Sequence, residues 1–286
     1  MPARQPFTAL CQAAARPRHA GRADLHLHTT HSDGTYTPQQ VVELARRSGL
    51  AAIALTDHDT CAGVPAARAA GGTDLEVIAG VEISTEHLGH ELHLLAYFVR
   101  TDDGPLTAAL ATIRAHRVER YHEMVRRLRA GGVVLDDEGP QAGPVPDTLG
   151  RRHLAEWLVR SGQVATVREA FARYLKDGAP AAAPKRRLPV AEALALVRGA
   201  GGVSSWAHPP ATVCLEQFAA LRNLGLNAVE VEYPEHRGAR TRQLRDFATK
   251  LGLAVSGGSD CHGPGPRAVG STTISGEELE RLRRLA

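Results

Sequence analysis

The sequence predicts an α/β protein, because short strands alternate with helices over most of its 286 residues. Strand periodicity begins at residues 23–28, where Leu25 and Leu27 face one side and His26 and His28 face the other. Apolar residues make up 43% of the chain and charged residues 23%, which is typical of a globular protein. The chain can therefore bury a core, and disorder over its whole length is excluded.

The pattern predicts strands and helices in alternation before residue 104 and again after residue 180. Strands are expected at 23–28, 50–55, 75–83, 91–99, 202–207, 227–232 and 253–256. Helices are expected at 37–48, 62–70, 189–199, 215–224, 239–251 and 276–285. The first helix begins at Thr37-Pro38 and stops at Gly49, because threonine caps helices, proline suits the first turn and glycine ends it. This order favours a largely parallel sheet.

Between these two parts the strands stop, and arginine-rich helical segments are expected at 105–130, 150–161 and 166–176. A stretch rich in glycine, proline and aspartate, 131–150, separates the first two of them. The predicted organisation is a core domain over 22–103 and 181–286, a helical insertion over 104–180, and a loosely ordered tail over 1–21.

Composition excludes several classes of protein. The apolar run 94–99 is far shorter than the roughly 20 residues that span a bilayer, so no membrane association is expected. The cysteines are widely separated and form no C-x-x-C pair, which favours a reducing compartment, and we expect a cytoplasmic protein. The net charge is only +3, which by itself predicts no nucleic-acid binding. No obligate protein partner is evident.

Histidine is the outlier, with 14 copies, and many of them follow predicted strands together with carboxylates. The candidate metal ligands are His26, His28, Asp33, His58, Glu82, His93, His208, Asp260 and His262. A single histidine on a strand is usually a hydrogen-bonded core residue, so the joint pattern carries the prediction. Nitrogen and carboxylate ligands without a cysteine pair suit Mn²⁺, Zn²⁺ or Fe²⁺. At three or four ligands per ion, the set could hold two or three metals.

The order and spacing of these residues from about 23 to 270 resemble the PHP (polymerase and histidinol phosphatase) superfamily of metal-dependent phosphoesterases. The motifs that carry the resemblance are Asp24-x-His26-x-His28, Thr56-Asp57-His58-Asp59, Gly80-Val81-Glu82-Ile83-Ser84, His93, Ala207-His208-Pro209 and Ser259-Asp260-x-His262. In the insertion, Arg117-x-x-Arg120, Gly150-Arg151-x-His153 and Pro184-Lys185-Arg186 resemble the subgroup of nucleoside 3′,5′-bisphosphate phosphatases and a related 5′-to-3′ exoribonuclease.

The resemblance implies a distorted (β/α)7 barrel with a small helical insertion that caps the substrate, and a trinuclear metal centre. The implied sites are His26, His28, Glu82 and Asp260 for one ion, Glu82, His93 and His208 for a second, and Asp33, His58 and His262 for a third. The expected cofactors are two or three divalent ions, Mn²⁺ foremost, with Zn²⁺, Fe²⁺ and Mg²⁺ as alternatives. No ligand position is substituted in this chain.

Phosphate esters resist hydrolysis because their oxygens are negative and neutral water is a poor nucleophile. Clustered divalent ions address both problems, so we expect a metal-bound hydroxide to attack phosphorus in line. The expected catalytic residues are Glu82, Asp260 and His208 as ligands. Asp57 and Asp59 are expected to orient His58 or its neighbours, with a solvated turn as the alternative.

Substrate recognition is expected from cations of the insertion and its junctions. The candidates are Arg117, Arg151, Lys185 and His236. Arginine suits bidentate phosphate contacts, and Arg151 and Lys185 lie near the two junctions between insertion and barrel. His236 follows a strand end, where a surface turn is an equal alternative. Five other histidines, His31, His87, His90, His116 and His122, are assigned no function.

The expected function is hydrolysis of a small nucleotide that carries two phosphates, such as a 3′,5′-bisphosphate. The alternative is a 5′-to-3′ exonuclease on short RNA or DNA. The near-neutral charge and an aromatic content of 4% favour short substrates over long strands. A histidinol-phosphatase-like enzyme and a metal-dependent amidohydrolase are less favoured, and a non-enzymatic module would be expected to lack ligands.

Overall fold

The computed structural model describes residues 21–136 and 146–286. The tail predicted for residues 1–21 lies outside these ranges except for Gly21, as does part of the predicted linker. One sheet dominates the fold, with the strand order β8-β7-β6-β4-β3-β2-β1-β9. Its main strands are β1 (Arg22–Leu27), β2 (Ala52–Leu55), β3 (Glu76–His87), β4 (His90–Tyr97), β6 (Val203–Trp206), β7 (Ala228–Glu232) and β8 (Ala254–Gly257). These are the strands that the sequence predicts, within a few residues.

The sheet curls until β8, at one end, lies close to β1 and the short end strand β9, which makes a nearly closed barrel. The Asp260 amide donates to the His26 carbonyl at 2.9 Å, and the His28 amide donates to the Cys261 carbonyl at 3.1 Å. Gly258 permits this approach, because a Cβ atom there would lie 2.3 Å from the His26 nitrogen. The predicted distorted (β/α)7 barrel is confirmed.

The parallel order is broken at β4, which pairs antiparallel with both β3 and β6. Only Leu88 and Gly89 connect β3 to β4, and both have positive φ, 52° and 79°. A two-residue turn of this kind forms a hairpin, whereas a parallel crossover needs a dozen or more residues. Two further strands, β5 (Leu188–Pro189) and β9 (Ile274–Ser275), are too short for a sequence pattern to reveal.

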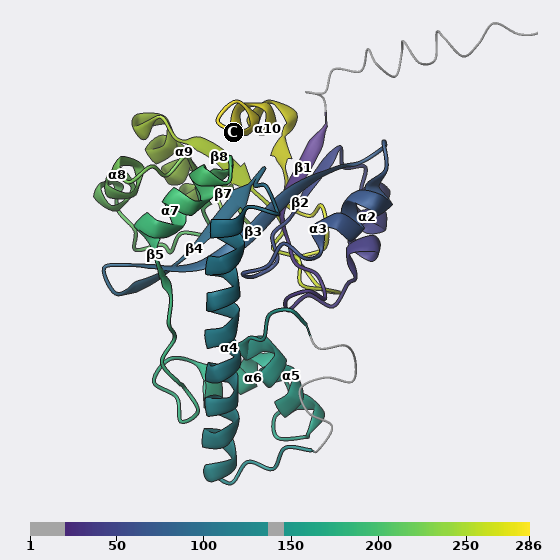
Figure 1. Ribbon diagram of the computed structural model, residues 1–286, viewed down its shortest axis with the longest axis vertical. Coiled ribbons are helices and arrows are strands. Elements are labelled where there is room, and N and C mark those ends of the chain that lie inside the picture. The colour runs from purple at the N-terminus through teal and green to yellow at the C-terminus, as the bar shows by residue number, and fades with distance from the viewer. Residues whose placement is uncertain (1–20, 137–145) are drawn as a thin grey trace, which may run out of the picture.

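Helices cover the outside of the barrel (Figure 1). They are α2 (Pro38–Arg47), α3 (Val64–Gly71), α7 (Val190–Gly199), α8 (Leu215–Asn223), α9 (Ala239–Leu251) and α10 (Gly276–Arg283). The start predicted for the first helix is confirmed, since the Thr37 side chain accepts from the Gln40 amide at 3.2 Å and Pro38 opens the helix. No helix in the described ranges is both long and apolar enough to cross a membrane.

The insertion is built on the 27-residue helix α4 (Gly104–Ala130), which extends from the barrel like a stalk (Figure 1). Its first half places Leu110 and Ile113 in the barrel core, and its second half places Met124 and Leu128 in a separate core. The other elements of that second core are α5 (Arg151–Arg160), α6 (Val167–Ala170) and a π-helical turn at Phe171–Leu175. The helix α4 thus joins the two cores.

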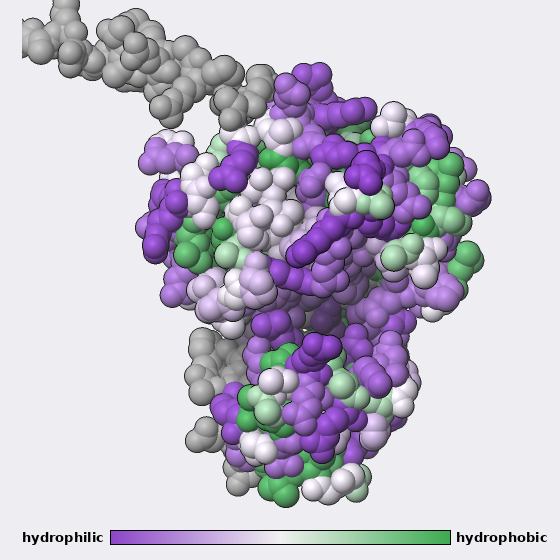
Figure 2. Space-filling model, turned by 180° about the vertical axis from the view of Figure 1, so that it is seen from behind, coloured by the Kyte–Doolittle hydropathy of each residue, from purple (hydrophilic) through white to green (hydrophobic). Residues whose placement is uncertain are grey.

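The face seen in Figure 2 is mostly hydrophilic over both parts, with small apolar areas between. A shaded hollow separates the larger barrel from the smaller insertion on this face.

Candidate metal centre

The structure brings all of the predicted metal ligands into one cluster. His26 lies on β1, and His28 directly follows that strand. Because side chains alternate along a strand, these two buried histidines share one face of the sheet. Glu82 and His93 come from the adjacent strands β3 and β4. The remaining ligands lie on loops after strands, where folds of this kind assemble active sites.

Glu82 lies at the centre of the cluster and is only 1% exposed. Its Oε2 atom faces three ring nitrogens, at 3.4 Å for His26 Nε2, 3.3 Å for His28 Nε2 and 3.1 Å for His58 Nδ1. Its Oε1 atom faces two others, at 2.8 Å for His93 Nδ1 and 3.1 Å for His208 Nε2. Each oxygen of Glu82 thus faces a different set of histidines.

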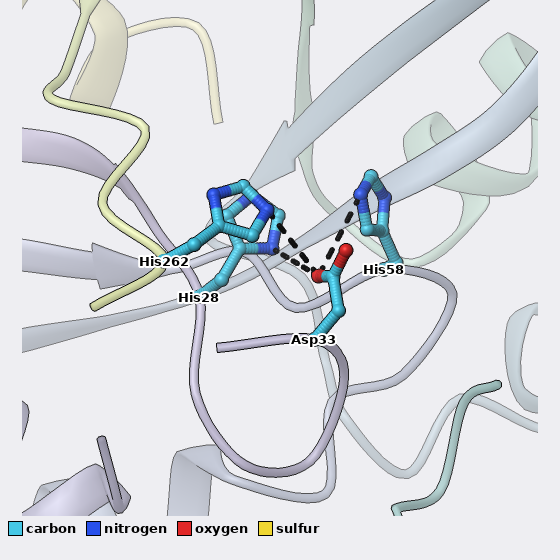
Figure 3. A group of neighbouring side chains, drawn as sticks. All are labelled: His28, Asp33, His58 and His262. Atoms are coloured by element: carbon cyan, nitrogen blue, oxygen red, sulfur yellow. Dashed lines mark ion pairs between the residues drawn. The ribbon is translucent and has the colours of Figure 1, made fainter. Parts of the chain in front are cut away.

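Two aspartates complete the cluster. Asp33 points at three imidazoles (Figure 3), and its Oδ1 atom lies 3.3 Å from His262 Nε2, 3.8 Å from His28 Nδ1 and 3.9 Å from His58 Nε2. Asp260 Oδ1 lies 3.4 Å from His26 Nε2 and 3.3 Å from His28 Nε2. His28 therefore faces the groups of both aspartates, one through each ring nitrogen.

Three atoms of this cluster are buried without a hydrogen-bond partner: His28 Nε2, Asp33 Oδ1 and His58 Nδ1. Buried polar atoms in proteins nearly always have partners, so such a concentration of exceptions indicates a missing ligand. Within the described residues, three sets have ligand atoms close enough to share an ion. They are His28, Asp33, His58 and His262; His26, His28 and Glu82; and His58, Glu82 and His93. Imidazole and carboxylate donors fit divalent ions such as Mn²⁺ or Zn²⁺.

The electrostatics of the cluster favour positive charge. Burial by itself would raise the pKa of Glu82, but His58 and His93 hold it well below its ordinary value. Burial would lower the pKa of His28, but the adjacent carboxylates of Asp260 and Glu82 raise it to about 10. Buried carboxylates that stabilise a proton on a neighbouring imidazole also stabilise a cation in its place.

Comparison with known proteins agrees with this geometry. The PHP domain family model matches residues 24–141. A 3′,5′-nucleoside bisphosphate phosphatase from Chromobacterium violaceum is 33% identical over 258 residues, which cover 87% of this chain and 90% of that protein. The chain belongs to the PHP family. It is a metal-dependent phosphoester hydrolase, as the resemblance of its motifs implies.

Two further proteins show the extent of the likeness. A 5′-3′ exoribonuclease from Salmonella typhimurium is 32% identical over 251 residues, covering 85% of this chain and 86% of its own. The crystal structure of a candidate metal-dependent phosphoesterase from Bifidobacterium adolescentis superposes with a TM-score of 0.86 at 30% identity, covering 92% of this chain and 96% of that one. The PHP fold therefore extends over nearly the whole chain.

Sequence reasoning missed Glu230, which is fully buried behind the PHP metal cluster. Its Oε1 atom lies 2.8 Å from His26 Nδ1, and its Oε2 atom accepts from the His208 amide at 2.6 Å. A carboxylate that binds the outer nitrogen of a ligand imidazole fixes its tautomer and its orientation. The available signal was a charged residue in the middle of the apolar strand β7, because a charge is seldom buried without a partner.

Asp57 and Asp59 are both buried, so the solvated-turn alternative does not hold. Asp57 Oδ1 accepts from the Thr29 amide and the Ser32 hydroxyl, both at 2.6 Å, so it fixes the loop that carries Asp33. Asp59 accepts from the Ser84 amide at 2.7 Å, beside Glu82 on β3. The structure thus shows these two aspartates contacting the segments that carry metal ligands.

The predicted substrate-binding residues are dispersed. Arg151 lines a cavity together with the metal-ligand candidates His93 and His208. Lys185 is nearly buried and pairs with Glu91, whose Oε1 atom also lies 3.1 Å from His93 Nε2. These two cations therefore lie next to the cluster.

The other two candidates, Arg117 and His236, do not line this cavity, whereas Arg151 lines it and also pairs with Asp177 at 3.1 Å. Arg117 Nε donates to Asp59 at 2.6 Å, and its side chain is 12% exposed. This buried ion pair ties α4 to the end of β2, which is a structural role that the motif alone did not indicate. His236 Nδ1 lies 3.2 Å from the Val231 carbonyl, so that nitrogen is not available to a ligand.

The insertion contacts the loop that carries Asp33 through His153, which is 5% exposed. His153 Nδ1 accepts from the Gly150 amide at 3.0 Å, so the ring proton resides on Nε2. That Nε2 atom is 2.9 Å from the Ser32 carbonyl, to which it donates. His31, assigned no function from sequence, pairs with Asp147 at the same junction. Two histidines thus link the insertion to a PHP metal-ligand loop.

Replacing Glu82 by Gln is expected to abolish activity and to remove most of the bound metal, because the amide cannot supply two anionic oxygens to two cations. The fold should persist, since Gln has nearly the same shape. Metal content by elemental analysis and the far-ultraviolet circular dichroism spectrum check both parts. A Glu82→Gln variant that retained its metal would contradict the bridging role.

Replacing His153 by Asn is expected to weaken metal binding about tenfold, because Asn can accept from Gly150 but is too short to reach the Ser32 carbonyl. His153→Gln is the matched control, since its amide nitrogen can occupy the position of Nε2. Titration of the metal-free proteins with Mn²⁺ measures the effect directly. Equal affinities in the Asn variant and the unmodified protein would show that the contact does not position Asp33.

Proposed function

We propose that this PHP protein hydrolyses phosphate esters of small nucleotides, as a 3′,5′-nucleoside bisphosphate phosphatase. The observation that carries the proposal is the placement of Arg151 beside His93 and His208 in one cavity of about 220 Å³. One phosphate would bind the metal cluster, and Arg151 offers a guanidinium for a second phosphate a short distance away. The sequence similarity to the Chromobacterium violaceum phosphatase supports the same substrate class.

The family resemblance implies three cation positions, and the short distances among the ligand atoms support them. We assign them to His26, His28, Glu82 and Asp260; to Glu82, His93 and His208; and to Asp33, His58 and His262. The donor chemistry favours Mn²⁺, with Zn²⁺, Fe²⁺ and Mg²⁺ as alternatives. When bound, such ions supply Lewis-acid catalysis, because they make water more acidic and neutralise the charge that develops on the phosphate.

The chain's own residues orient these ligands. Glu91 holds the outer nitrogen of His93 and is in turn held by Lys185 and Arg187. Burial by itself would raise the pKa of Glu91, but the hydrogen bond to His93 and the charge of Lys185 keep it well below its ordinary value. Burial and the nearby Arg117 lower the pKa of Lys185 to about 8. The Glu91 carboxylate is therefore ionised at neutral pH and fixes the ring of His93.

Exonuclease activity on short RNA or DNA is the second candidate. Arg127, Lys185 and Arg187 line a larger cavity, of about 660 Å³, along the insertion. Such a basic surface suits the additional phosphates of an oligonucleotide. The similarity to the Salmonella typhimurium exoribonuclease supports this candidate as well.

A reducing location suits the thiols of the chain. Cys61, Cys214 and Cys261 are all unpaired. Free cysteines persist in reducing compartments, so we propose that the protein works in the cytoplasm.

Phosphate release from adenosine 3′,5′-bisphosphate in the presence of Mn²⁺ is the direct test. We expect release from this nucleotide and none after chelation of the metal. A 5′-phosphorylated RNA of a few nucleotides, assayed in parallel for mononucleotide products, distinguishes the exonuclease. If the RNA is shortened and the nucleotide is untouched, the phosphatase assignment fails.

Replacing Arg151 by Ala is expected to lower kcat/KM for the bisphosphate about tenfold or more, because a charge-assisted contact to phosphate is lost. Arg152→Ala is the matched control, since the neighbouring arginine pairs with Glu156 on the helix surface and lines no part of this cavity. Steady-state kinetics on the purified proteins measures both. Equal values for the two variants would remove Arg151 from the substrate site.

A further inference from the structure

A second cavity, of about 450 Å³, adjoins the one at the metal cluster. The two cavities share Glu91 and Leu92 of β4, Trp206 of β6, and Pro210 in the loop that follows β6. A molecule with its phosphate at His93 and His208 can therefore extend into the second cavity without leaving the protein surface. None of the sequence motifs indicates this cavity.

Its walls are mainly apolar. Leu92, Trp206 and Val213 line it together with Leu221 of helix α8. No arginine or lysine of the described residues takes part in the lining, so it is not a second phosphate site. The polar residues on its border are His87, His90, Glu91, Thr212, Glu216 and Gln217. Apolar walls with a few polar groups are typical of sites for flat heterocyclic molecules.

Trp206 has a fixed position in the wall. Its ring packs on Phe218 with 4.6 Å between the ring centroids, and the residue is 6% exposed. An aromatic side chain held in this way offers a rigid surface to a bound ring at little cost in conformational entropy. Trp206 is one of only two tryptophans in the chain.

We propose that this cavity binds the nucleobase of the substrate whose phosphate lies at the metal cluster. The inference rests on the proposed nucleotide substrate and goes further, because it places base recognition in a particular part of the barrel. The side chains of Leu92, Trp206 and Val213 provide apolar contacts for the two faces of the base. The amide of Gln217 and the hydroxyl of Thr212 can each donate or accept a hydrogen bond at the base edge. Phosphate esters without a base lack these contacts and are poorer substrates.

Replacing Ala220 by Phe tests the proposal, because Ala220 is an exposed residue of α8 that lines the cavity, so a larger side chain there fills it. The matched control is Ala195→Phe, at an exposed position of α7 outside the lining. We expect the Ala220 variant to lose about tenfold in kcat/KM on adenosine 3′,5′-bisphosphate, the size of one lost base contact. Hydrolysis of glycerol 2-phosphate, which has no base, should stay within about twofold.

An equal loss on both esters, or no loss on either, overturns the proposal. Thr212→Trp, from the other side of the cavity, repeats the test if the Ala220 variant does not fold. Binding of adenosine itself, followed by tryptophan fluorescence, separates this proposal from the catalytic one. We expect saturable binding by the unmodified protein and by Ala195→Phe, and a loss of binding in Ala220→Phe.

Failure of the enzyme on every phosphate ester would refute the proposed function. Adenosine binding would still show whether the cavity binds a nucleobase. Conversely, if the enzyme is an active phosphatase and the Ala220→Phe variant binds adenosine as well as the unmodified protein, the proposed function stands and the base-site proposal is refuted.

Discussion

The burial of the Glu82 carboxylate among five imidazoles is the interaction on which the rest of the site depends. An ionised carboxylate in the protein interior is costly unless cations surround it. Here the histidines come from β1, β4 and three loops, so the carboxylate is stable only when the barrel has brought those segments together. The fold and the cation requirement therefore support each other, and the site is formed by the barrel as a whole.

Two of the loops that carry candidate metal ligands have a strained backbone. His208 and Asp260 have φ values of 30° and 52°, a region that residues other than glycine seldom occupy. Strain of this kind, about 1–3 kcal/mol for each residue, persists only where the surroundings hold it. The Glu230 carboxylate binds the His208 amide, and Asp24 accepts from the Ser259 amide at 2.9 Å beside Asp260. Buried carboxylates thus hold the strained loops as well as the ligand imidazoles.

The sequence was sufficient to predict the strands, most of the helices and the cluster of metal ligands, because each depends on local periodicity or on a short motif. It did not predict the antiparallel β4, Glu230 or the part played by His153. Those depend on which segments meet in space, and nothing within a few residues of Glu230 or His153 records the partner. Arg117 illustrates the same limit, since its motif suggested a substrate while its guanidinium pairs with Asp59.

The first turn of α5 contacts two parts of the candidate site. Arg151 and His153 lie two residues apart, one lining the metal-site cavity and the other donating to the Ser32 carbonyl next to Asp33. A shift of this helix would therefore move both Arg151 and the loop that carries Asp33. If Arg151 binds substrate and Asp33 binds metal as proposed, one helix turn would couple the two events.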